Sequence, residues 1–365
     1  GFMRRGFSAE EADALIQKSV RLAQEARDLY LAACGTDENK PLVAASVGPY
    51  GAYLADGSEY RGDYGVDEGA LTADHSLRLS ECAGIFHYCQ EVFEGLKAYE
   101  TADGHIVTFR PDLNAARMYD SAAYLEMPSF PKERFLEAVD AVVAANRDYV
   151  PPYGSDASLY LRPFMFASEE FVGVHPAGVV DYYVIGSPSG PYFTGGFAGV
   201  PIWVVRGYHR AGPGGTGSAK AGGNYAASLL PQIEAEQRGF SQVCFLDTYE
   251  EKYLEELGGM NMFVVMADGS VRTPELSGVI LEGCTRSAIL RLLRDDGVDV
   301  SEERIALDDL VAGIRSGAVA EVFACGTAAV VTPISRLASD DFDIELPVGD
   351  LTRRIHERLT DIQMG

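Results

Sequence analysis

The chain has 365 residues, 47% of them apolar, so it can bury one large core or two medium ones, and we expect two domains. Its 30 basic against 54 acidic residues give a net charge of −24, which disfavours binding to nucleic acid or to an anionic membrane surface. The 6 cysteines form no Cys-x-x-Cys pair, which argues against a zinc site or a disulfide framework and fits a reducing cytoplasm.

The N-terminal region predicts a helix followed by a strand. Residues 1–5 lack the apolar core of a signal peptide, and no run of about 18 apolar residues could span a membrane, so we expect a soluble, cytoplasmic protein. Ser8 and Glu11 form a capping box, and apolar residues then recur at helical spacing as far as Cys34, which predicts one long amphipathic helix. The apolar run 41–47 predicts a buried strand of the kind found in parallel sheets.

Helical and strand patterns alternate with turn signals in the rest of the chain. Strands are predicted at 106–109, 159–168, 179–187, 200–205, 242–246, 262–266 and 322–324. Helices are predicted at 112–125, 132–146, 226–237, 286–294 and 307–316. A turn-rich connector suggests a division into an atypical N-terminal segment 1–66, a small α/β domain 67–186, an interdomain loop 187–198 and a larger domain 199–365.

The stretch 217–228 places Lys220 among small residues, with Tyr225 five positions further on. A lysine becomes a Schiff-base nucleophile when its ammonium is partly desolvated or lies near other cations, because either condition lowers its pKa. Small neighbours would also let a flat cofactor lie against the backbone. The same string suits an exposed lysine beside a glycine turn, so other segments must decide between the two interpretations.

The wider pattern resembles the branched-chain amino-acid aminotransferases, class IV aminotransferases of fold type IV that use pyridoxal 5'-phosphate. The resemblance covers about residues 68–360 and follows the family's order of motifs. The motifs are Val92-Phe-Glu-Gly-Leu-Lys-Ala-Tyr99, Phe109-Arg-Pro-Asp-Leu-Asn-Ala-Ala-Arg117, Leu159-Tyr-Leu-Arg-Pro163, 217–228, Glu255-Glu-Leu-Gly-Gly-Met-Asn261, Glu282-Gly-Cys-Thr-Arg286 and Cys325-Gly-Thr-Ala-Ala329.

The resemblance implies an α/β (α+β) fold of two α/β domains, the larger one binding the cofactor, and a homodimer. It also implies transamination of branched-chain or related apolar L-amino acids with 2-oxoglutarate, in a ping-pong reaction through a Lys220 Schiff base. No metal is expected.

The resemblance assigns cofactor roles to particular residues. Lys220 would also move the substrate proton, Tyr225 would hydrogen-bond the phenolate oxygen, and Glu256 would lie beside the pyridine nitrogen. The implied phosphate ligands are the Arg117 guanidinium, the backbone amides of Cys284 and Thr285 at a helix N-terminus, and the Thr327 hydroxyl. Taken without the resemblance, Arg117 suits a solvated helix face and Glu256 an acidic surface run.

The resemblance also implies a substrate pocket. Thr327 and Ala328 would offer amides to the α-carboxylate, and Arg162 would accept the distal carboxylate of glutamate. The implied side-chain pocket contains Tyr88, Phe93, Tyr160, Val174, Tyr192 and Gly259. Aromatic residues in this set equally suit core packing.

Two positions depart from the family pattern. Glu282 replaces a proline, which would place a carboxylate near the phosphate and weaken cofactor affinity by repulsion. Gly259 stands where some relatives carry threonine, which would widen the pocket toward aromatic side chains.

Residues 1–66 resemble an internal fragment of a homocysteine S-methyltransferase and replace the strands with which an aminotransferase of this type begins, which suggests a fusion or a recombination. A closed barrel needs about 250 residues, and the chain has no Gly-Cys-Cys pair to supply zinc thiolates. Three alternatives to the branched-chain activity stay open: an aminotransferase for an aromatic or specialised 2-oxo acid, an inactive chimera with a binding or structural role, and a homocysteine S-methyltransferase.

Overall fold

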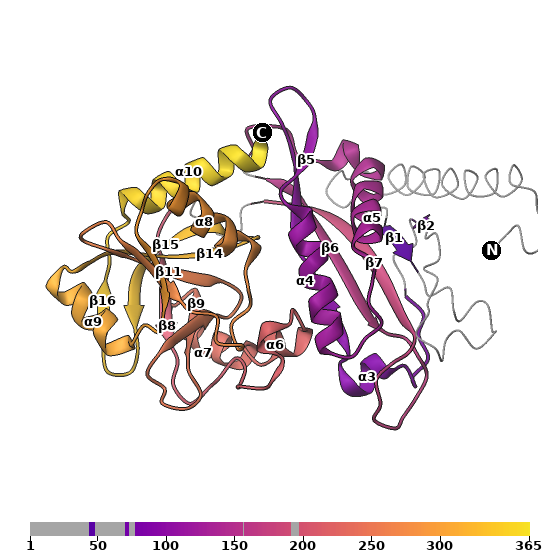
Figure 1. Ribbon diagram of the computed structural model, residues 1–365, viewed down its shortest axis with the longest axis horizontal. Coiled ribbons are helices and arrows are strands. Elements are labelled where there is room, and N and C mark those ends of the chain that lie inside the picture. The colour runs from indigo at the N-terminus through magenta and orange to yellow at the C-terminus, as the bar shows by residue number, and fades with distance from the viewer. Residues whose placement is uncertain (1–43, 48–69, 73–76, 156, 191–196) are drawn as a thin grey trace, which may run out of the picture.

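The computed structural model describes residues 44–47, 70–72, 77–155, 157–190 and 197–365 (Figure 1). These residues form two β-sheets with helices packed against them. The helix predicted from Ser8, most of the segment 1–66 and the predicted site residue Tyr192 lie outside the described residues.

The first sheet has seven strands in the order β2-β1-β7-β6-β4-β5, with β3 paired to β6, and all of its pairings are antiparallel. Its strands are β1 (Ala44–Val47), β2 (Ala70–Thr72), β3 (Glu91–Phe93), β4 (Leu96–Glu100), β5 (Ile106–Thr108), β6 (Ser158–Ala167) and β7 (Val180–Ser189). Its helices are α3 (Gly84–Tyr88), α4 (Pro111–Tyr124) and α5 (Lys132–Ala145), followed by a 3₁₀ turn at Arg147–Tyr149.

The two faces of this sheet differ in burial, and successive residues of a strand point to opposite faces. On one face Leu96 and Leu161 are buried in a core that includes residues of α4 and α5, such as Met118 and Phe135. The residues that point to the other face are only partly buried. They include Lys97 on β4 and Tyr160 and Arg162 on β6. The polar face of the sheet is therefore free to line a site.

The second sheet has nine strands in the order β10-β9-β8-β15-β14-β11-β12-β13, with β16 paired to β15. Its strands are β8 (Val200–Val204), β9 (Gln242–Leu246), β10 (Leu254–Leu257), β11 (Asn261–Met266), β12 (Val271–Pro274), β13 (Val300–Glu303), β14 (Val319–Gly326), β15 (Val330–Ala338) and β16 (Asp343–Glu345). Its helices are α6 (Gly222–Ala226), α7 (Leu229–Gln237), α8 (Cys284–Asp295), α9 (Leu307–Ser316) and α10 (Asp350–Met364), and a 3₁₀ turn lies at Thr216–Ser218.

The centre of the second sheet is buried on both faces. On β11, Met262 and Val264 pack toward α9, whereas Phe263 and Val265 pack toward α8 and α10. Phe263 stacks on Phe323 of β14, with ring centroids 5.0 Å apart. Strands covered on both sides are apolar at every position, which explains why this segment shows no polar alternation.

Three secondary-structure predictions need correction. The strand expected at 41–47 exists as β1, but it pairs antiparallel with both neighbours, because a short apolar run does not specify strand direction. The helix expected at 226–237 exists as α7, but it begins three residues later, at Leu229, and the short helix α6 that precedes it was not predicted. Pro231 has no N–H to donate to residue 227, so it is accommodated only in the first turn of a new helix.

The third correction concerns β15, which was not predicted and which contains Pro333, a residue that is unfavourable in a central strand. The structure accommodates it beside an irregularity in the pairing with β8 between Ile334 and Arg336. The predicted boundary 187–198 lies between the last strand of the first sheet and the first strand of the second, although residues 187–189 belong to β7 rather than to a turn. The division into domains itself stays a prediction.

Candidate active site

A cavity of about 460 Å³ is lined by residues of both sheets. The first sheet and α4 contribute Phe93, Gly95, Arg117, Tyr160 and Arg162. The second part of the chain contributes the other predicted site residues, Lys220, Tyr225, Glu256, Gly259, Cys284, Thr285, Thr327 and Ala328. Residues far apart in the sequence therefore surround one space.

Lys220 lies in a short extended segment, and hydrogen bonds hold both its backbone N–H and its backbone carbonyl. Its backbone N–H donates to the Ser121 hydroxyl at 2.9 Å, and its carbonyl accepts from the N–H of Phe93 at 3.1 Å. Its Nζ donates to the Tyr225 hydroxyl at 2.8 Å and lies 4.8 Å from the centroid of the Phe93 ring. A side chain at Gly217 would collide with the Val279 carbonyl, since a Cβ there would lie 2.3 Å from it. Glycine is thus required at position 217 for the close approach to Val279 that positions the Lys220 segment.

Arg117 forms a buried two-point ion pair with Glu94, a residue for which the sequence predicted no role. Its Nε and Nη2 donate to the two carboxylate oxygens at 2.7 and 2.8 Å, and its Nη1 donates to the Glu282 carbonyl at 2.9 Å. The Asn114 amide also donates to Glu94, at 2.8 Å. Burial alone would raise the pKa of Glu94, but the Arg117 guanidinium holds that pKa below its usual range. Arg117 is therefore fixed at the cavity wall beside the first residue of α8, Cys284.

Glu256 lies at the opposite wall, on β10, and is 3% exposed. Its Oε1 forms an ion pair with Arg210 Nη1 at 2.9 Å and accepts a hydrogen bond from the Leu281 N–H at 2.8 Å. Burial raises the pKa of Glu256 to about 7, and Arg210 opposes that rise. Arg210 likewise had no predicted role. Its Nε and Nη2 are buried and have no hydrogen-bond partner among the described residues.

Tyr160 and Arg162 lie side by side above the cavity. Arg162 Nη2 donates to the Tyr160 hydroxyl at 3.0 Å, and its guanidinium carbon lies 4.7 Å from the centroid of the Phe93 ring. Gly95 makes this arrangement possible, because a Cβ at that position would lie 2.1 Å from the Tyr160 hydroxyl. Phe93 in turn packs edge-on against Tyr225, at 4.9 Å between ring centroids. The Phe93 ring therefore contacts both the Arg162 guanidinium and Tyr225, the residue that hydrogen-bonds Lys220.

The Amino-transferase class IV family model matches residues 91–337, most of the chain. The branched-chain-amino-acid aminotransferase of Mycolicibacterium smegmatis is 45% identical over 340 residues, which cover 90% of this chain and 92% of that protein. The chain belongs to the class IV aminotransferase family. The Mycobacterium tuberculosis branched-chain-amino-acid aminotransferase is 49% identical over 295 residues, 79% of this chain and 80% of the relative.

Solved structures of this family have the same fold. The branched-chain aminotransferase of Thermoproteus uzoniensis with norvaline matches with a TM-score of 0.69 and 28% identity, covering 81% of this chain and 92% of that one. The branched-chain amino acid aminotransferase of Escherichia coli matches with a TM-score of 0.67 and 29% identity, with the same coverage. The expected fold type IV architecture is confirmed.

A second family model, Homocysteine S-methyltransferase, matches residues 2–128. The resemblance expected at the N-terminus is thus present, and it extends beyond residue 66 into the part that the aminotransferase model also matches. In the described ranges no group of three or more His, Cys, Asp or Glu residues is placed to hold a metal ion. None of the described helices is long and apolar enough to cross a membrane.

Two of the predicted substrate residues that the structure describes do not line the candidate active-site cavity. Tyr88 is partly exposed, stacks on Phe171 at 5.8 Å and donates its hydroxyl hydrogen to the Val172 carbonyl. Val174 is 85% exposed. Tyr192 lies outside the described residues. The described pair shares a surface at α3 and the loop after β6, so neither residue lines the cavity of its own chain.

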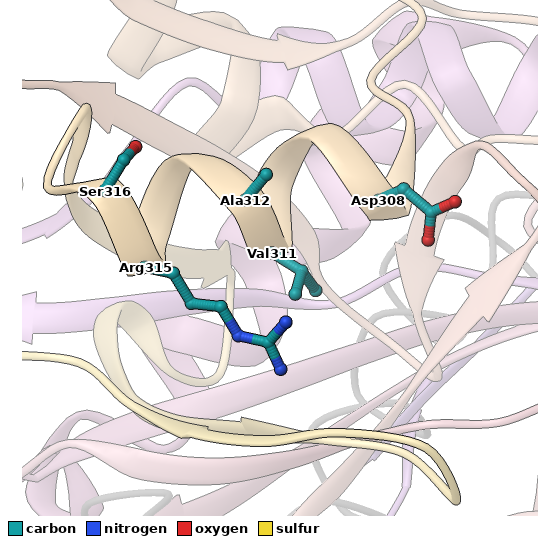
Figure 2. Close-up of a pocket in the computed structure, with 5 residues that line it drawn as sticks. All are labelled: Asp308, Val311, Ala312, Arg315 and Ser316. Atoms are coloured by element: carbon teal, nitrogen blue, oxygen red, sulfur yellow. The ribbon is translucent and has the colours of Figure 1, made fainter.

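Glu282 does not line the candidate active site. Its backbone carbonyl accepts from Arg117, and this exposed residue lines a neighbouring cavity of about 450 Å³ that shares Arg117, Gly283 and Cys284 with the candidate active site. The weaker cofactor affinity expected from the Glu282 carboxylate stays a prediction. Another hollow, of about 550 Å³, lies on one helix face, lined by Asp308, Val311, Ala312, Arg315 and Ser316 of α9 (Figure 2). It contains none of the predicted site residues.

The burial of the Glu94–Arg117 pair predicts that two Glu→Gln substitutions differ greatly in their effect on the free energy of unfolding. We expect Glu94→Gln to lower the free energy of unfolding by about 3 kcal/mol, because it leaves the Arg117 charge buried without its counter-ion. The matched control is Glu137→Gln, which removes the partner of Arg134 in a surface pair and should cost under about 0.5 kcal/mol. Urea unfolding of both variants measures the difference. Equal small losses would contradict the assignment.

Glu255 predicts a pH-dependent stability. Burial, with the Asp247 and Glu256 carboxylates, raises its pKa in the folded protein to about 7 from 4.5, so its contribution to stability is lost as pH rises through that interval. We expect Glu255→Gln to raise the free energy of unfolding by about 1–3 kcal/mol at pH 8 and to change it little near pH 5.

The matched control for this prediction is Glu357→Gln, on the exposed side of α10, which should have no such pH dependence. Urea unfolding near pH 5 and at pH 8 measures the free energy of unfolding of both variants. A Glu255→Gln variant that is equally destabilised at both values would show that the carboxylate is not raised in pKa.

Proposed function

We propose that the protein is a pyridoxal-phosphate-dependent aminotransferase that moves an amino group between branched-chain L-amino acids and 2-oxoglutarate. The observation that carries this proposal is the Lys220 amine, 2.8 Å from the Tyr225 hydroxyl, in a cavity with Glu256 at one wall and Arg117 with the N-terminus of α8 at the other. The names of the relatives support the choice of amino acid.

The residues present fit pyridoxal phosphate by the chemistry of their donors. Lys220 supplies the amine that binds the group covalently, and Tyr225 lies where it can donate to the phenolate oxygen. The charged and amide donors that would hold the phosphate are Arg117, the backbone N–H groups of Cys284 and Thr285, and the Thr327 hydroxyl. Glu256 is buried, and only a carboxylate that is partnered or protonated is stable there.

Pyridoxal phosphate, when bound, supplies an aldehyde that condenses with amines and a ring that accepts the electrons left on the substrate α-carbon. This chain's residues supply the rest. Glu256 would keep a proton at the pyridine nitrogen, which its raised pKa of about 7 makes possible near neutral pH. Lys220, whose Nζ lies against the Phe93 and Tyr225 rings, would move the proton of the α-carbon. The ping-pong order follows because one cavity serves both substrates in turn.

The side-chain pocket has to accept both apolar and acidic substrates. Phe93, Tyr160 and Gly259 provide an apolar and open wall, and Arg162 provides a cation whose Nε is buried without a partner in the described part of the chain. Solved relatives are complexed with norvaline, with 4-methylvaleric acid and with N-(5'-phosphopyridoxyl)-L-glutamate, that is, with ligands of both kinds. We assign Arg162 to the distal carboxylate of glutamate or 2-oxoglutarate.

We also propose a cytoplasmic homodimer with the domains 67–186 and 199–365. The proposal accounts for Tyr88 and Val174, which are exposed on the surface rather than in their own cavity, since a second subunit would place them at its site. The backbone amides of Thr327 and Ala328 would receive the α-carboxylate.

A second candidate substrate class is the aromatic 2-oxo acids. A Cβ added at Gly259 would meet only the Tyr225 ring, at 3.7 Å, so the cavity is open at this position. Kinetics on a panel of branched-chain and aromatic oxo acids separate the two. A preference for the aromatic acids would overturn the branched-chain assignment and leave the reaction type intact.

The covalent role of Lys220 predicts a specific chemical outcome. We expect the protein with cofactor to absorb at the edge of the visible range and to lose that band on borohydride reduction, with the modified peptide containing Lys220. Lys220→Ala should lower the transamination rate at least about 10²-fold, because the proton carrier is lost. Lys132→Ala, at an exposed lysine, is the control. A protein that takes up no reducible cofactor would instead favour the inactive chimera.

Arg162 predicts a difference between the two substrates. In Arg162→Met the KM for 2-oxoglutarate should rise at least about tenfold, since a charge-assisted hydrogen bond is lost, while the KM for leucine should change less than about threefold. The control is Arg134→Met on the surface of α5. Equal increases for both substrates would show that Arg162 maintains the cavity rather than selecting the carboxylate.

A further inference from the structure

Glu91 is a partly buried residue on the same face of the first sheet as Phe93 and Arg162. In the β3–β6 pairing Glu91 is directly opposite Phe166, and Phe93 is directly opposite Phe164. Directly opposite residues of an antiparallel pair point to the same side, and every second residue of β6 shares that side, so Arg162 points there too. A carboxylate is thus placed on the sheet face that carries the proposed substrate residues. The sequence predicted no role for it.

The Glu91 carboxylate lies against the backbone that follows Lys220. The Phe93 N–H donates to the Lys220 carbonyl at 3.1 Å, which aligns β3 with residues 220–222. A Cβ added at Gly222 would lie 2.2 Å from Glu91 Oε2, so the absence of a side chain there leaves room for the carboxylate. The Gly222 N–H donates a hydrogen bond to it. The carboxylate is therefore positioned by a backbone donor rather than by direct contact with a cation.

The positive charge of Arg162 is only partly balanced by its neighbours. Its Nη2 donates to the Tyr160 hydroxyl at 3.0 Å, and its Nε is buried with no hydrogen-bond partner in the described part of the chain. A neutral hydroxyl does not offset a full charge in a partly buried site. Burial raises the pKa of Glu91, and the Gly222 N–H and the Arg162 charge oppose that rise. The charges of Glu91 and Arg162 therefore interact, although none of the described ion pairs joins them.

The two proposed substrates make opposite demands on Arg162. The distal carboxylate of 2-oxoglutarate would give Arg162 a direct counter-ion, whereas a branched alkyl group leaves the guanidinium in apolar surroundings. A charge in apolar surroundings is costly unless an anion nearby offsets it. A fixed carboxylate that is near Arg162 but not bound to it favours the apolar ligand, and by repulsion it disfavours a second carboxylate.

We propose that Glu91 is a specificity-determining residue: its charge offsets that of Arg162 while an apolar side chain occupies the pocket, and it repels the distal carboxylate of an acidic substrate. The inference rests on the proposed function and deepens it, because it names the group that sets the balance between the two substrates. In the alternative role Glu91 only supports residues 220–222 through the Gly222 N–H, and removal of its charge would then affect both kinds of ligand alike.

The experiment compares two ligands that differ at the distal end. Glutarate has a second carboxylate there, and 4-methylvalerate has a branched alkyl group. The Kd of each ligand for the protein loaded with pyridoxal phosphate is measured by absorption titration at pH 8, well above the usual pKa of a glutamate. Glu91→Gln removes the charge and retains an acceptor for the Gly222 N–H, whereas Glu91→Asp retains the charge. Glu133→Gln, at an exposed position of α5, is the matched control for the change in net charge.

We expect Glu91→Gln to lower the Kd for glutarate and to leave unchanged or raise the Kd for 4-methylvalerate. The ratio of the two Kd values should move at least about threefold in favour of glutarate, because charges in a partly buried site interact beyond ion-pair distance. Glu91→Asp and the control Glu133→Gln should keep the wild-type ratio to within about twofold, since neither changes the charge beside Arg162.

A double-mutant cycle shows whether the effect acts through Arg162. In an Arg162→Met background, Glu91→Gln should change the ratio of the two Kd values less than about twofold, because the charge that Glu91 offsets is absent. A purely structural role of Glu91 would give the same change in both backgrounds.

The outcomes that overturn the inference differ from the one that overturns the proposed function. If the wild type takes up cofactor and Glu91→Gln keeps the wild-type ratio, or moves it away from glutarate, Glu91 only supports the backbone. An equal shift in the Arg162→Met background leads to the same conclusion. Should Glu91→Gln fail to fold, Glu91→Ser, which also removes the charge, decides by the same ratio. If the wild type forms no borohydride-reducible band with pyridoxal phosphate, the proposed function fails, and the assignment of Glu91 fails with it.

Discussion

The buried ion pair of Arg117 with Glu94 is the interaction on which the candidate site depends. Arg117 is on α4, packed on the first sheet, and its third donor bonds the carbonyl of Glu282, just before α8. One side chain thus sets the distance between the first sheet and the N-terminus of α8. The Val92–Ala221 bridge and the hydrogen bond from the Lys220 N–H to the Ser121 hydroxyl join β3 and α4 to the Lys220 segment. Because a charge without its partner is costly in the interior, loss of either member of the ion pair would destabilise this arrangement.

The charge of the site is opposite to that of the whole molecule. The chain has a net charge of −24, yet the described cavity and its immediate surroundings gather five cations around three carboxylates, those of Glu91, Glu94 and Glu256. The cations are Arg117, Arg162, Arg210, Lys97 and Lys220. A local excess of positive charge in a partly buried cavity attracts anions and raises their local concentration. The proposed cofactor and both proposed substrates carry phosphate or carboxylate groups. The surrounding acidic surface would keep nucleic acid away without affecting the cavity.

Local patterns were sufficient for some elements and not for others. The helix at 307–316 and the strand at 242–246 were predicted with their observed ends, because apolar spacing alone defines them. β15 was missed: it contains Pro333, which is unfavourable within a strand, and its pairing with β14 and β8 is not visible in its own local sequence. The site followed the same rule. Lys220 stood out through its own neighbours, whereas Glu94 and Arg210 acquire their roles from partners distant in the sequence, which no local string reveals.

The two buried glutamates show how one residue type is given two tasks. Glu94 receives two hydrogen bonds from Arg117, one from the Asn114 amide and one from the Gly95 N–H, so its pKa is lowered and it stays ionised as a fixed counter-charge. Glu256 forms an ion pair with Arg210 and receives hydrogen bonds from the Leu281 N–H and, at 3.5 Å, from the Asn261 amide. Here burial dominates, and the pKa of Glu256 rises to about 7. A difference in the number of donors therefore separates a carboxylate that only orients from one that can share a proton. Exchange of the two environments would leave the proposed phosphate site without a fixed arginine and the proposed pyridine site without a group that can hold a proton. The donors around each glutamate, rather than the glutamates themselves, therefore determine what each can do.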